Sequence, residues 1–350
     1  MSVSFSDRVR GCLVGGALGD ALGAPTEFLS LDRIRARYGP DGPDRPMPAY
    51  GLPNAATDDT QMTLFTAEGL VRAAEAGAAT VEDAARHVWA AYRHWYATQG
   101  YAIGPDERTG GLLDRPDLCA QRAPGNTCLS ALAAPDFPAG GVAANDSKGC
   151  GGVMRAAPAS LAGHPALGLP GTPFGLGCAV AALTHGHPTG YVSAGAFAHL
   201  VRLLLDGGDL PAAVRATLAF VRDRDENGET TAALHTALAL FDAGAPPAPE
   251  TFARLGVGYA TARGGGWIAE EALGGAVWAA LTSDGTAEGN AAALRLAATH
   301  SGDTDSTASI AGNLLGAAYG FGALPQDWLA GLDLLDVAEA MARALSGVPA

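Results

Sequence analysis

Residues 6–24 read SDRVRGCLVGGALGDALGA, and beyond Arg10 they are apolar nearly all the way round a helix. Ser6 and Asp7 are residue types that commonly begin a helix, and a helix without a polar face is usually buried on every side. The segment is rich in glycine and alanine, which indicates helices packed at short distances. We therefore expect a helical protein with this segment in its interior.

Helical periodicity continues along most of the chain. Thr57 begins a second segment that Gly77 ends, and Thr80 begins a third that Gly100 ends. Further helical patterns cover about residues 127–134, 175–184, 189–206, 211–224, 229–243, 267–281, 288–299, 305–320 and 334–346. The sequence shows neither a series of alternating strands nor a strand–helix alternation. We expect an all-α fold, a single compact orthogonal helical domain over residues 1–350.

Composition limits the possible partners and location. The chain has 22 Lys and Arg against 36 Asp and Glu, a formal charge of −14, which gives no basis for binding nucleic acid or an anionic membrane surface. Its five cysteines form no C-x-x-C pair, so we expect small buried thiols in a reducing compartment. No apolar run approaches the roughly 18 residues of a membrane span. We expect a cytoplasmic monomer.

Two acidic clusters stand out, residues 57–60 (TDDT) and residues 303–307 (DTDST). Each lies where a helix is expected to begin, so ordinary helix capping is one interpretation. The other is metal binding, because short runs with only oxygen ligands suit Mg²⁺, Mn²⁺ or Ca²⁺. If the fold joins the clusters, their mutual repulsion requires cations, and two metals could polarise a substrate and position a water.

The second cluster also matches D-x-D-x-T, a pattern of phosphatases in which an aspartate attacks phosphorus. Such a motif should follow a buried strand, whereas residues 297–302, AATHSG, precede it here. An EF-hand loop is excluded, since Leu314 stands where its twelfth position requires Glu. The phosphatase therefore remains an alternative with an unfavourable context.

A third element is the glycine-rich loop SKGCGGVMR, residues 147–155. Glycine backbone can approach phosphate oxygens closely, and Lys148 and Arg155 are expected to add positive charge there. Glycines also serve turns and close helix contacts, which is the simpler interpretation.

Several single residues complete the candidates. Asp20 lies in an apolar neighbourhood, where a structural role is expected, and Glu27 follows a proline on a loop and is free to act on a ligand. His185 and His187 are better suited to capping or ligand contact than to a metal. His87 and His94 are expected to be solvated.

The chain resembles the ADP-ribosylglycohydrolase family, which includes the dinitrogenase reductase-activating glycohydrolases. The matching motifs follow one another over nearly the whole chain: GGALGDALGAPTEF (15–28), TDDT (57–60), RAPGNTCL (122–129), KGCGGVMRAAP (148–158), THGHPTGY (184–191), GGGWIAEEAL (264–273) and HSGDTDSTA (300–308).

The resemblance implies an all-α fold with a cleft that holds two divalent cations, Mg²⁺ or Mn²⁺. The implied metal ligands are Thr57, Asp58, Asp59, Asp303, Asp305 and Ser306. The implied catalytic carboxylates are Glu27, Asp59 and Asp303. The implied ADP-ribose-binding residues are Gly149, Cys150, Gly151, Gly152, Met154 and His185, with His185 near the distal ribose.

The activity implied is hydrolysis of the bond between C1 of the distal ribose and an acceptor. The substrate is either an ADP-ribosylated protein or a small ADP-ribose conjugate, and arginine-linked ADP-ribose is the first expectation. Two alternatives stay open, the aspartate-nucleophile phosphatase and a catalytically silent relative that only binds ADP-ribose.

Overall fold

The computed structural model describes residues 3–347. In that range the chain is helical, with isolated backbone bridges but no β-sheet. The α-helices are α1 (Phe5–Gly23), α2 (Leu31–Tyr38), α3 (Asp58–Glu75), α4 (Val81–Thr98), α5 (Asn126–Leu132), α6 (Pro173–Ala182), α7 (Pro188–Leu205), α8 (Leu210–Val221), α9 (Glu229–Asp242), α10 (Ala269–Leu281), α11 (Ala287–Ala297), α12 (Thr304–Tyr319) and α13 (Leu335–Leu345). The expected all-α fold is confirmed.

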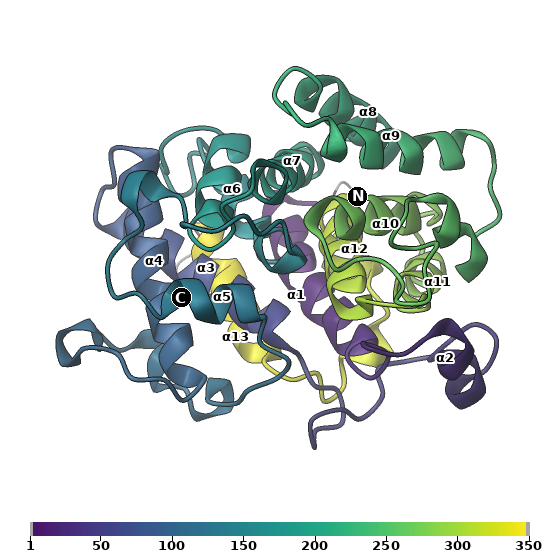
Figure 1. Ribbon diagram of the computed structural model, residues 1–350, viewed down its shortest axis with the longest axis horizontal. Helices are drawn as coiled ribbons and strands as arrows, with labels where there is room; N and C mark the ends of the chain where they lie inside the picture. The colour runs from purple at the N-terminus through teal and green to yellow at the C-terminus, as the bar shows by residue number, and fades with distance from the viewer. Residues whose placement is uncertain (1–2, 348–350) are drawn as a thin grey trace.

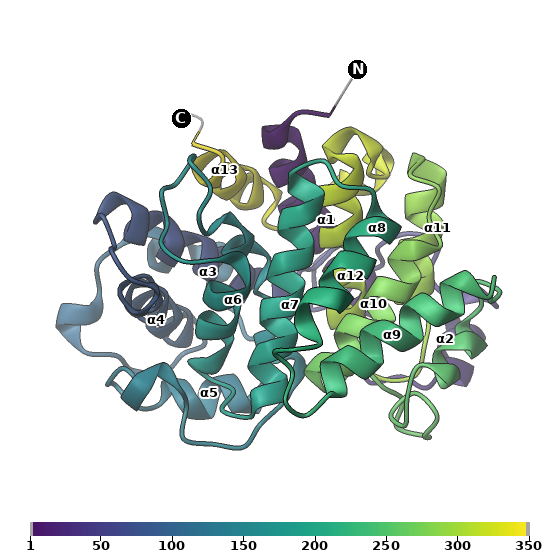
Figure 2. The same cartoon turned by 90° about the horizontal axis from the view of Figure 1, so that it is seen from above.

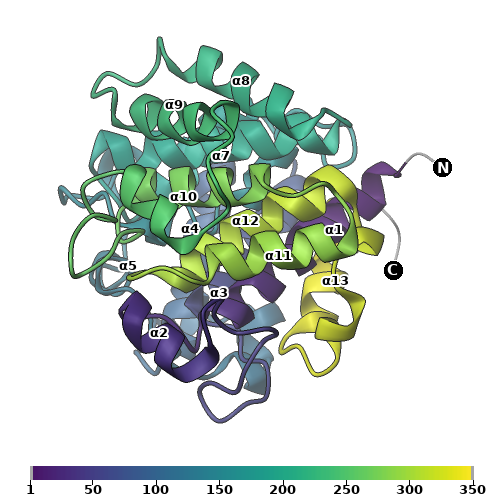
Figure 3. The same ribbon diagram turned by 90° about the vertical axis from the view of Figure 1, so that its right-hand side faces the viewer.

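Helix α1 is the buried centre of the molecule and packs most extensively against α12 (Figures 1 and 3). The two helices run antiparallel, and glycines bring their backbones into direct contact. A Cβ built on Gly15 would collide with the carbonyl of Gly312, and one built on Gly11 would collide with that of Gly316. At the other end, Gly23 faces the backbone of Thr304. The end of α1 therefore lies at the beginning of α12.

Most of the remaining helices lie in two groups, which Figure 2 shows on either side of α7. One group contains α3, α4, α5 and α6, and the other contains α8 to α11 and lies on the same side as α12. Helix α13 covers α1 and α3. The first acidic cluster begins α3 and the second begins α12, so the two clusters come from different sides of α7.

Every helix that the periodicity predicted is present, with ends within a few residues of those expected. Helix α2 is an additional one. Its sequence LDRIRARY is mostly charged and buries only Ile34, so it has no apolar stripe that periodicity could detect. Ser30 caps it by accepting a hydrogen bond from the Arg33 N–H.

Two expectations about single residues are wrong. His94 is buried rather than solvated, and its Nε2 lies 2.6 Å from the carbonyl oxygen of Glu107. That partner belongs to the loop after α4, which the helical pattern of α4 does not reveal. Cys119 is exposed, whereas Cys12 and Cys128 are buried as expected.

Along residues 3–347, none of the helices is both long enough and apolar enough to cross a membrane.

The contact between α1 and α12 predicts the effect of a single methyl group. Gly312→Ala places a Cβ against the Gly15 backbone, which cannot rotate away as a side chain could. We expect a loss of roughly 1–3 kcal/mol in the free energy of unfolding, measured by urea denaturation. Gly322→Ala is the control, because Gly322 is exposed and has nothing within 4 Å of its built Cβ. Equal stability of the two variants would contradict the packing argument.

Candidate active site

The first acidic cluster occupies the first turn of α3. Thr57 caps the helix by accepting a hydrogen bond from the Asp59 N–H (3.2 Å). Asp58 accepts one from the Gly125 N–H (3.2 Å), which ties the turn to the loop before α5. Neither Asp58 nor Asp59 needs its carboxylate for the cap, so both are available for another purpose.

The second cluster occupies the start of α12. The N–H of Ser306 donates to Asp303 Oδ1 (3.3 Å) and to Asp305 Oδ1 (3.0 Å). Asp303 Oδ2 also accepts the thiol proton of Cys150 (2.8 Å), from the glycine-rich loop. Asp303 therefore does cap α12, but one oxygen of Asp303 and one of Asp305 take no part in the cap.

Asp20 connects α1 to the first cluster. Its carboxylate accepts hydrogen bonds from the Thr57 N–H (2.8 Å), the Thr60 N–H (3.1 Å) and the Thr60 hydroxyl (2.5 Å). Burial, and next the charge of Asp305, raise the pKa of Asp20 to about 7. These contacts confirm the structural role expected for Asp20, which fixes the start of α3 against α1.

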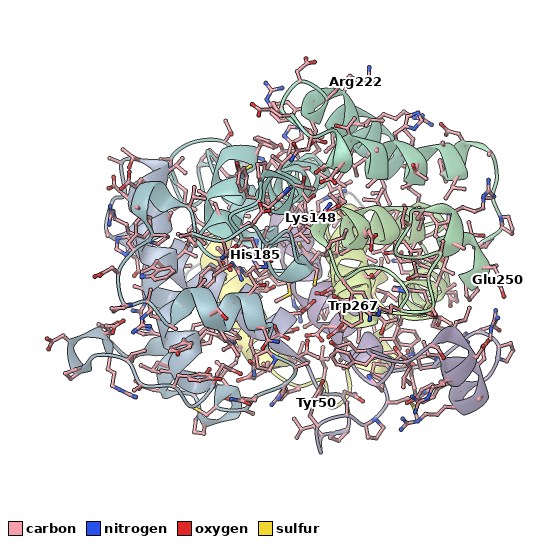
Figure 4. The ribbon with its side chains drawn as sticks, viewed as in Figure 1. Tyr50, Lys148, His185, Arg222, Glu250 and Trp267 are labelled. Carbon is pink, nitrogen blue, oxygen red and sulfur yellow. The ribbon has the colours of Figure 1, made fainter. Side chains whose placement is uncertain are left out.

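Both clusters open into one cavity of about 320 Å³. Most of the site residues predicted from the sequence line this cavity: Glu27, Asp58, Asp59, Gly149, Cys150, Gly151, Met154, His185, Asp303, Asp305 and Ser306. Thr57 and Gly152 are buried and do not line it. Figure 4 shows two of the lining residues, His185 and Trp267, near the middle of the molecule.

The carboxylates in this cavity repel one another. Burial, and next the charge of Asp305, raise the pKa of Asp58, Asp59 and Asp303 well above the ordinary range of aspartate. Burial and the charges of Asp305 and Asp303 also raise the pKa of Glu27 far above its usual value. Buried carboxylates of this kind must be neutralised by protons or by cations.

Two of these carboxylates have an oxygen that nothing in the described chain satisfies. Asp59 Oδ2 and Glu27 Oε2 are buried and have no hydrogen-bond partner. Among residues 3–347, no three His, Cys, Asp or Glu side chains are already arranged to hold a metal ion. The chemistry of the donors nevertheless fits hard cations, because the cluster is made of carboxylate and hydroxyl oxygens with unsatisfied positions.

Glu27 reaches the cavity from the tight turn that follows α1. Phe28, the next residue, has a φ of 63°, a left-handed conformation that is rare for a bulky side chain. Its ring stacks on Trp267, with centroids 5.4 Å apart, and is 65% exposed. The turn thus places a carboxylate inside the cavity and an aromatic ring at its rim.

The glycine-rich loop forms another part of the wall, beside the second cluster. Its backbone is fixed to the segment before α10, because the Cys150 N–H donates to the Trp267 carbonyl (3.1 Å) and the Ala269 N–H to the Lys148 carbonyl (2.9 Å). A Cβ built on Gly151 would lie 3.0 Å from Cys128 Sγ and 3.2 Å from His185 Cε1. Any side chain at position 151 would therefore take up space between the loop and its neighbours.

The two basic residues of this loop do not face the cavity, so the expected positive charge there is wrong. Lys148 pairs with Glu229 (2.7 Å) and Glu270 (2.5 Å), and it does not line the cavity. Arg155 is completely buried behind the loop. Both cations have structural partners that lie far away in the sequence, and the motif itself does not reveal them.

The two histidines after α6 have different positions. His187 caps α7, since its Nδ1 accepts a hydrogen bond from the Thr189 N–H (3.1 Å). His185 lines the cavity beside the glycine-rich loop. Of the two roles expected for these histidines, His187 performs capping and His185 is placed for ligand contact.

Sequence reasoning missed part of the wall. Phe28, Trp267 and the loop from Ala123 to Cys128 line the cavity but were not singled out as site residues. The signal was present, since all of them fall inside motifs that carried the family resemblance. Their residue types alone, aromatic or small, do not distinguish a cavity wall from a core.

The structure is thus that of an all-α protein in which two acidic clusters and a glycine-rich loop line one cavity. The ADP-ribosylglycohydrolase family model matches residues 1–349, and the chain belongs to this family.

Individual relatives agree with the assignment. The chain is 28% identical, over 60% of its length and 62% of the relative's, to the ADP-ribosyl-dinitrogen reductase glycohydrolase of Rhodospirillum rubrum. It is 25% identical, over 92% of its length and 74% of the relative's, to the ADP-ribosylarginine hydrolase Tri1 of Serratia proteamaculans. The chain matches four curated relatives, and in three of them the match covers less than two thirds of the relative's own length.

A solved structure, that of an ADP-ribosylglycohydrolase-related protein complex, is similar over 98% of both chains. Its TM-score is 0.63 and its sequence identity is 26%. This similarity covers the cavity together with the helices that form it.

The acidic cluster predicts a response to divalent cations. Because cations relieve the repulsion only in the folded state, Mn²⁺ or Mg²⁺ should raise the melting temperature, and EDTA should reverse the rise. With the cation at a hundredfold excess over its Kd, the free energy of unfolding should rise by roughly 2.7 kcal/mol. Asp305→Asn should lose most of this gain, yet without metal it should melt as high as the wild type, since one repelling charge is gone.

The matched control is Asp327→Asn, an exposed aspartate that lies 3.8 Å from Arg45. It should keep the full response, measured by differential scanning fluorimetry and by metal content. Two metals per chain in Asp305→Asn would contradict the assignment of Asp305 as a ligand.

Proposed function

We propose that this protein is a metal-dependent hydrolase that removes ADP-ribose from a modified acceptor. The observation that carries the proposal is the single cavity in which Glu27 and both acidic clusters face the Gly149–Gly151 loop and His185. The carboxylates would provide oxygen ligands for cations that hold a ribose diol, and the glycine-rich loop would provide closely approachable backbone for a diphosphate. Family membership supports the same activity.

The metal-binding residues proposed are Thr57, Asp58, Asp59, Asp303, Asp305 and Ser306, around two Mg²⁺ or Mn²⁺ ions. Five of the six line the cavity, while Thr57 lies directly behind it as the cap of α3. Bound cations supply positive charge that polarises the ribose hydroxyls and holds a water near C1.

The chain's own carboxylates handle the proton. In the hydrolysis, the water oxygen bonds to C1 of the distal ribose while the bond from C1 to the acceptor breaks. One water proton passes to a carboxylate, which then returns a proton to the leaving acceptor, so the carboxylate ends in its starting state. Glu27 and Asp59 are the candidates, since each has a buried oxygen without a partner. Asp303 is a weaker one, because both of its oxygens accept hydrogen bonds from within the chain.

Arginine-linked ADP-ribose is the acceptor linkage that we propose first. The Serratia proteamaculans relative is named for hydrolysis of ADP-ribosylarginine, and the match covers 92% of this chain. An ADP-ribosylated protein is accordingly the partner proposed, for a cytoplasmic and monomeric enzyme.

The phosphatase alternative loses its support. Its motif needs a preceding buried strand, whereas Asp303 follows a loop and begins α12 in a chain without a β-sheet over residues 3–347.

A silent relative is distinguished by measurement. ADP-ribosylarginine, ADP-ribosylserine and O-acetyl-ADP-ribose are each incubated with Mg²⁺ or Mn²⁺, and ADP-ribose release is followed by mass spectrometry. Release from none of them would reject the proposed function.

Glu27→Gln tests the proton-handling role. The substitution keeps size and hydrogen bonding but removes the group that can accept a proton, so we expect kcat to fall by at least a hundredfold. The affinity for free ADP-ribose, measured by calorimetry, should change little. Glu75→Gln, on the exposed end of α3, is the control and should keep full turnover. Unchanged kcat in Glu27→Gln would exclude Glu27 from the proton-handling role.

Gly151→Val tests the diphosphate wall. The added side chain enters the space between the loop, Cys128 and His185, so ADP-ribose should bind at least tenfold more weakly while the melting temperature changes modestly. Gly256→Val is the matched control, because nothing lies within 4 Å of its built Cβ. Normal affinity in a folded Gly151→Val protein would reject this wall as the phosphate site.

A further inference from the structure

Arg155 is a completely buried cation without a carboxylate partner among residues 3–347. One face of its guanidinium lies 4.3 Å from the ring centroid of Tyr92, and Nη1 points to the sulfur of Cys128 (3.2 Å). Its shortest hydrogen bond runs from Nη2 to the hydroxyl oxygen of Thr184 (2.6 Å). A buried charge is costly, so this arrangement needs a reason beyond helix packing.

The hydrogen bond with Arg155 determines the direction of the next one. A guanidinium can only donate, so Thr184 Oγ1 accepts from Arg155. The hydroxyl hydrogen of Thr184 then remains for its other partner, His185 Nδ1, at 2.8 Å. The reverse arrangement would aim an Nδ1–H at an oxygen that already faces a positive charge. The chain of contacts therefore favours His185 as an acceptor at Nδ1.

The two ring nitrogens of His185 face different surroundings. Nδ1 lies toward Gly152, which is buried, whereas Nε2 lies 3.4 Å from the built Cβ positions of both Gly149 and Gly151, which line the cavity. Burial, and next the charge of Arg155, lower the pKa of His185 to about 3, so the ring is neutral near pH 7. A neutral imidazole carries one N–H, and its position decides what the ring offers to the cavity.

We propose that Thr184, with its hydroxyl oriented by the buried guanidinium of Arg155, is a positioning residue that holds His185 in the tautomer protonated on Nε2. His185 then presents a hydrogen-bond donor to the cavity, suited to a hydroxyl or phosphate oxygen of the ligand and unsuited to act as a base there. The identity of that ligand as ADP-ribose rests on the proposed function, whereas the tautomer does not.

The first test measures the tautomer directly. Protein labelled with ¹⁵N-histidine is studied by long-range ¹H–¹⁵N NMR as wild type, Thr184→Ser and Thr184→Val, with the His185 signals assigned by their loss in His185→Gln. We expect a protonated Nε2 and an unprotonated, hydrogen-bonded Nδ1 in the wild type and in Thr184→Ser. In Thr184→Val, which has the same shape without the hydroxyl, the Nδ1 resonance should shift as its donor is lost.

The second test measures the consequence for binding. Thr184→Val should weaken the affinity for free ADP-ribose about tenfold, and Thr184→Ser should restore it. A protonated Nδ1 in the wild type overturns the inference. If Thr184→Val does not fold, the wild-type spectrum alone is the test. Nδ1 resonances that coincide in Thr184→Val and the wild type also overturn it. A wild type that shows the expected tautomer but binds no ADP-ribose instead rejects the proposed function and leaves the tautomer intact.

Discussion

Direct backbone contact between α1 and α12 is the constraint on which the rest of the structure depends. Glycines at positions 11 and 15 meet glycines at 316 and 312, so no side chain separates the two helices there. Because they run antiparallel, the end of α1 meets the start of α12, and the turn that carries Glu27 falls beside Asp303 and Asp305. The site is thus a consequence of helix packing, since a wider separation would move Glu27 away from the second cluster.

The same packing concentrates negative charge where the protein cannot neutralise it. No Lys or Arg of the described chain lines the cavity. Lys148 is paired with two glutamates, and Arg155 donates to Thr184 behind the glycine-rich loop. The carboxylates must therefore obtain their compensation from protons or from bound cations. This lack of internal compensation is the main physical reason to propose metal ions, independently of the family.

The sequence predicted what depends on local pattern. Twelve helices follow from periodicity and capping residues, and the two acidic clusters are visible because carboxylates are conspicuous at the starts of largely apolar helices. Helix α2 has no apolar stripe, so periodicity could not find it. The partners of Lys148 and Arg155 come from other segments of the chain, and the partner of His94 lies in the loop after α4, so the motif or helix that contains each residue does not reveal its partner. The stack of Phe28 on Trp267 is likewise a tertiary contact between segments more than two hundred residues apart.

The carboxylates and the glycine-rich loop differ in what they offer an anionic ligand. A diphosphate placed against Asp58, Asp59 and Asp303 would add charge to a cluster that already raises its own pKa values. The glycine-rich loop offers backbone and, with His185 neutral, a donor without formal charge. On the proposed function, such neutral donors would bind phosphate oxygens without attracting the nearby carboxylates, as a lysine or arginine at the same place would. The positions of Lys148 and Arg155 outside the cavity would then leave the acidic clusters free for cations.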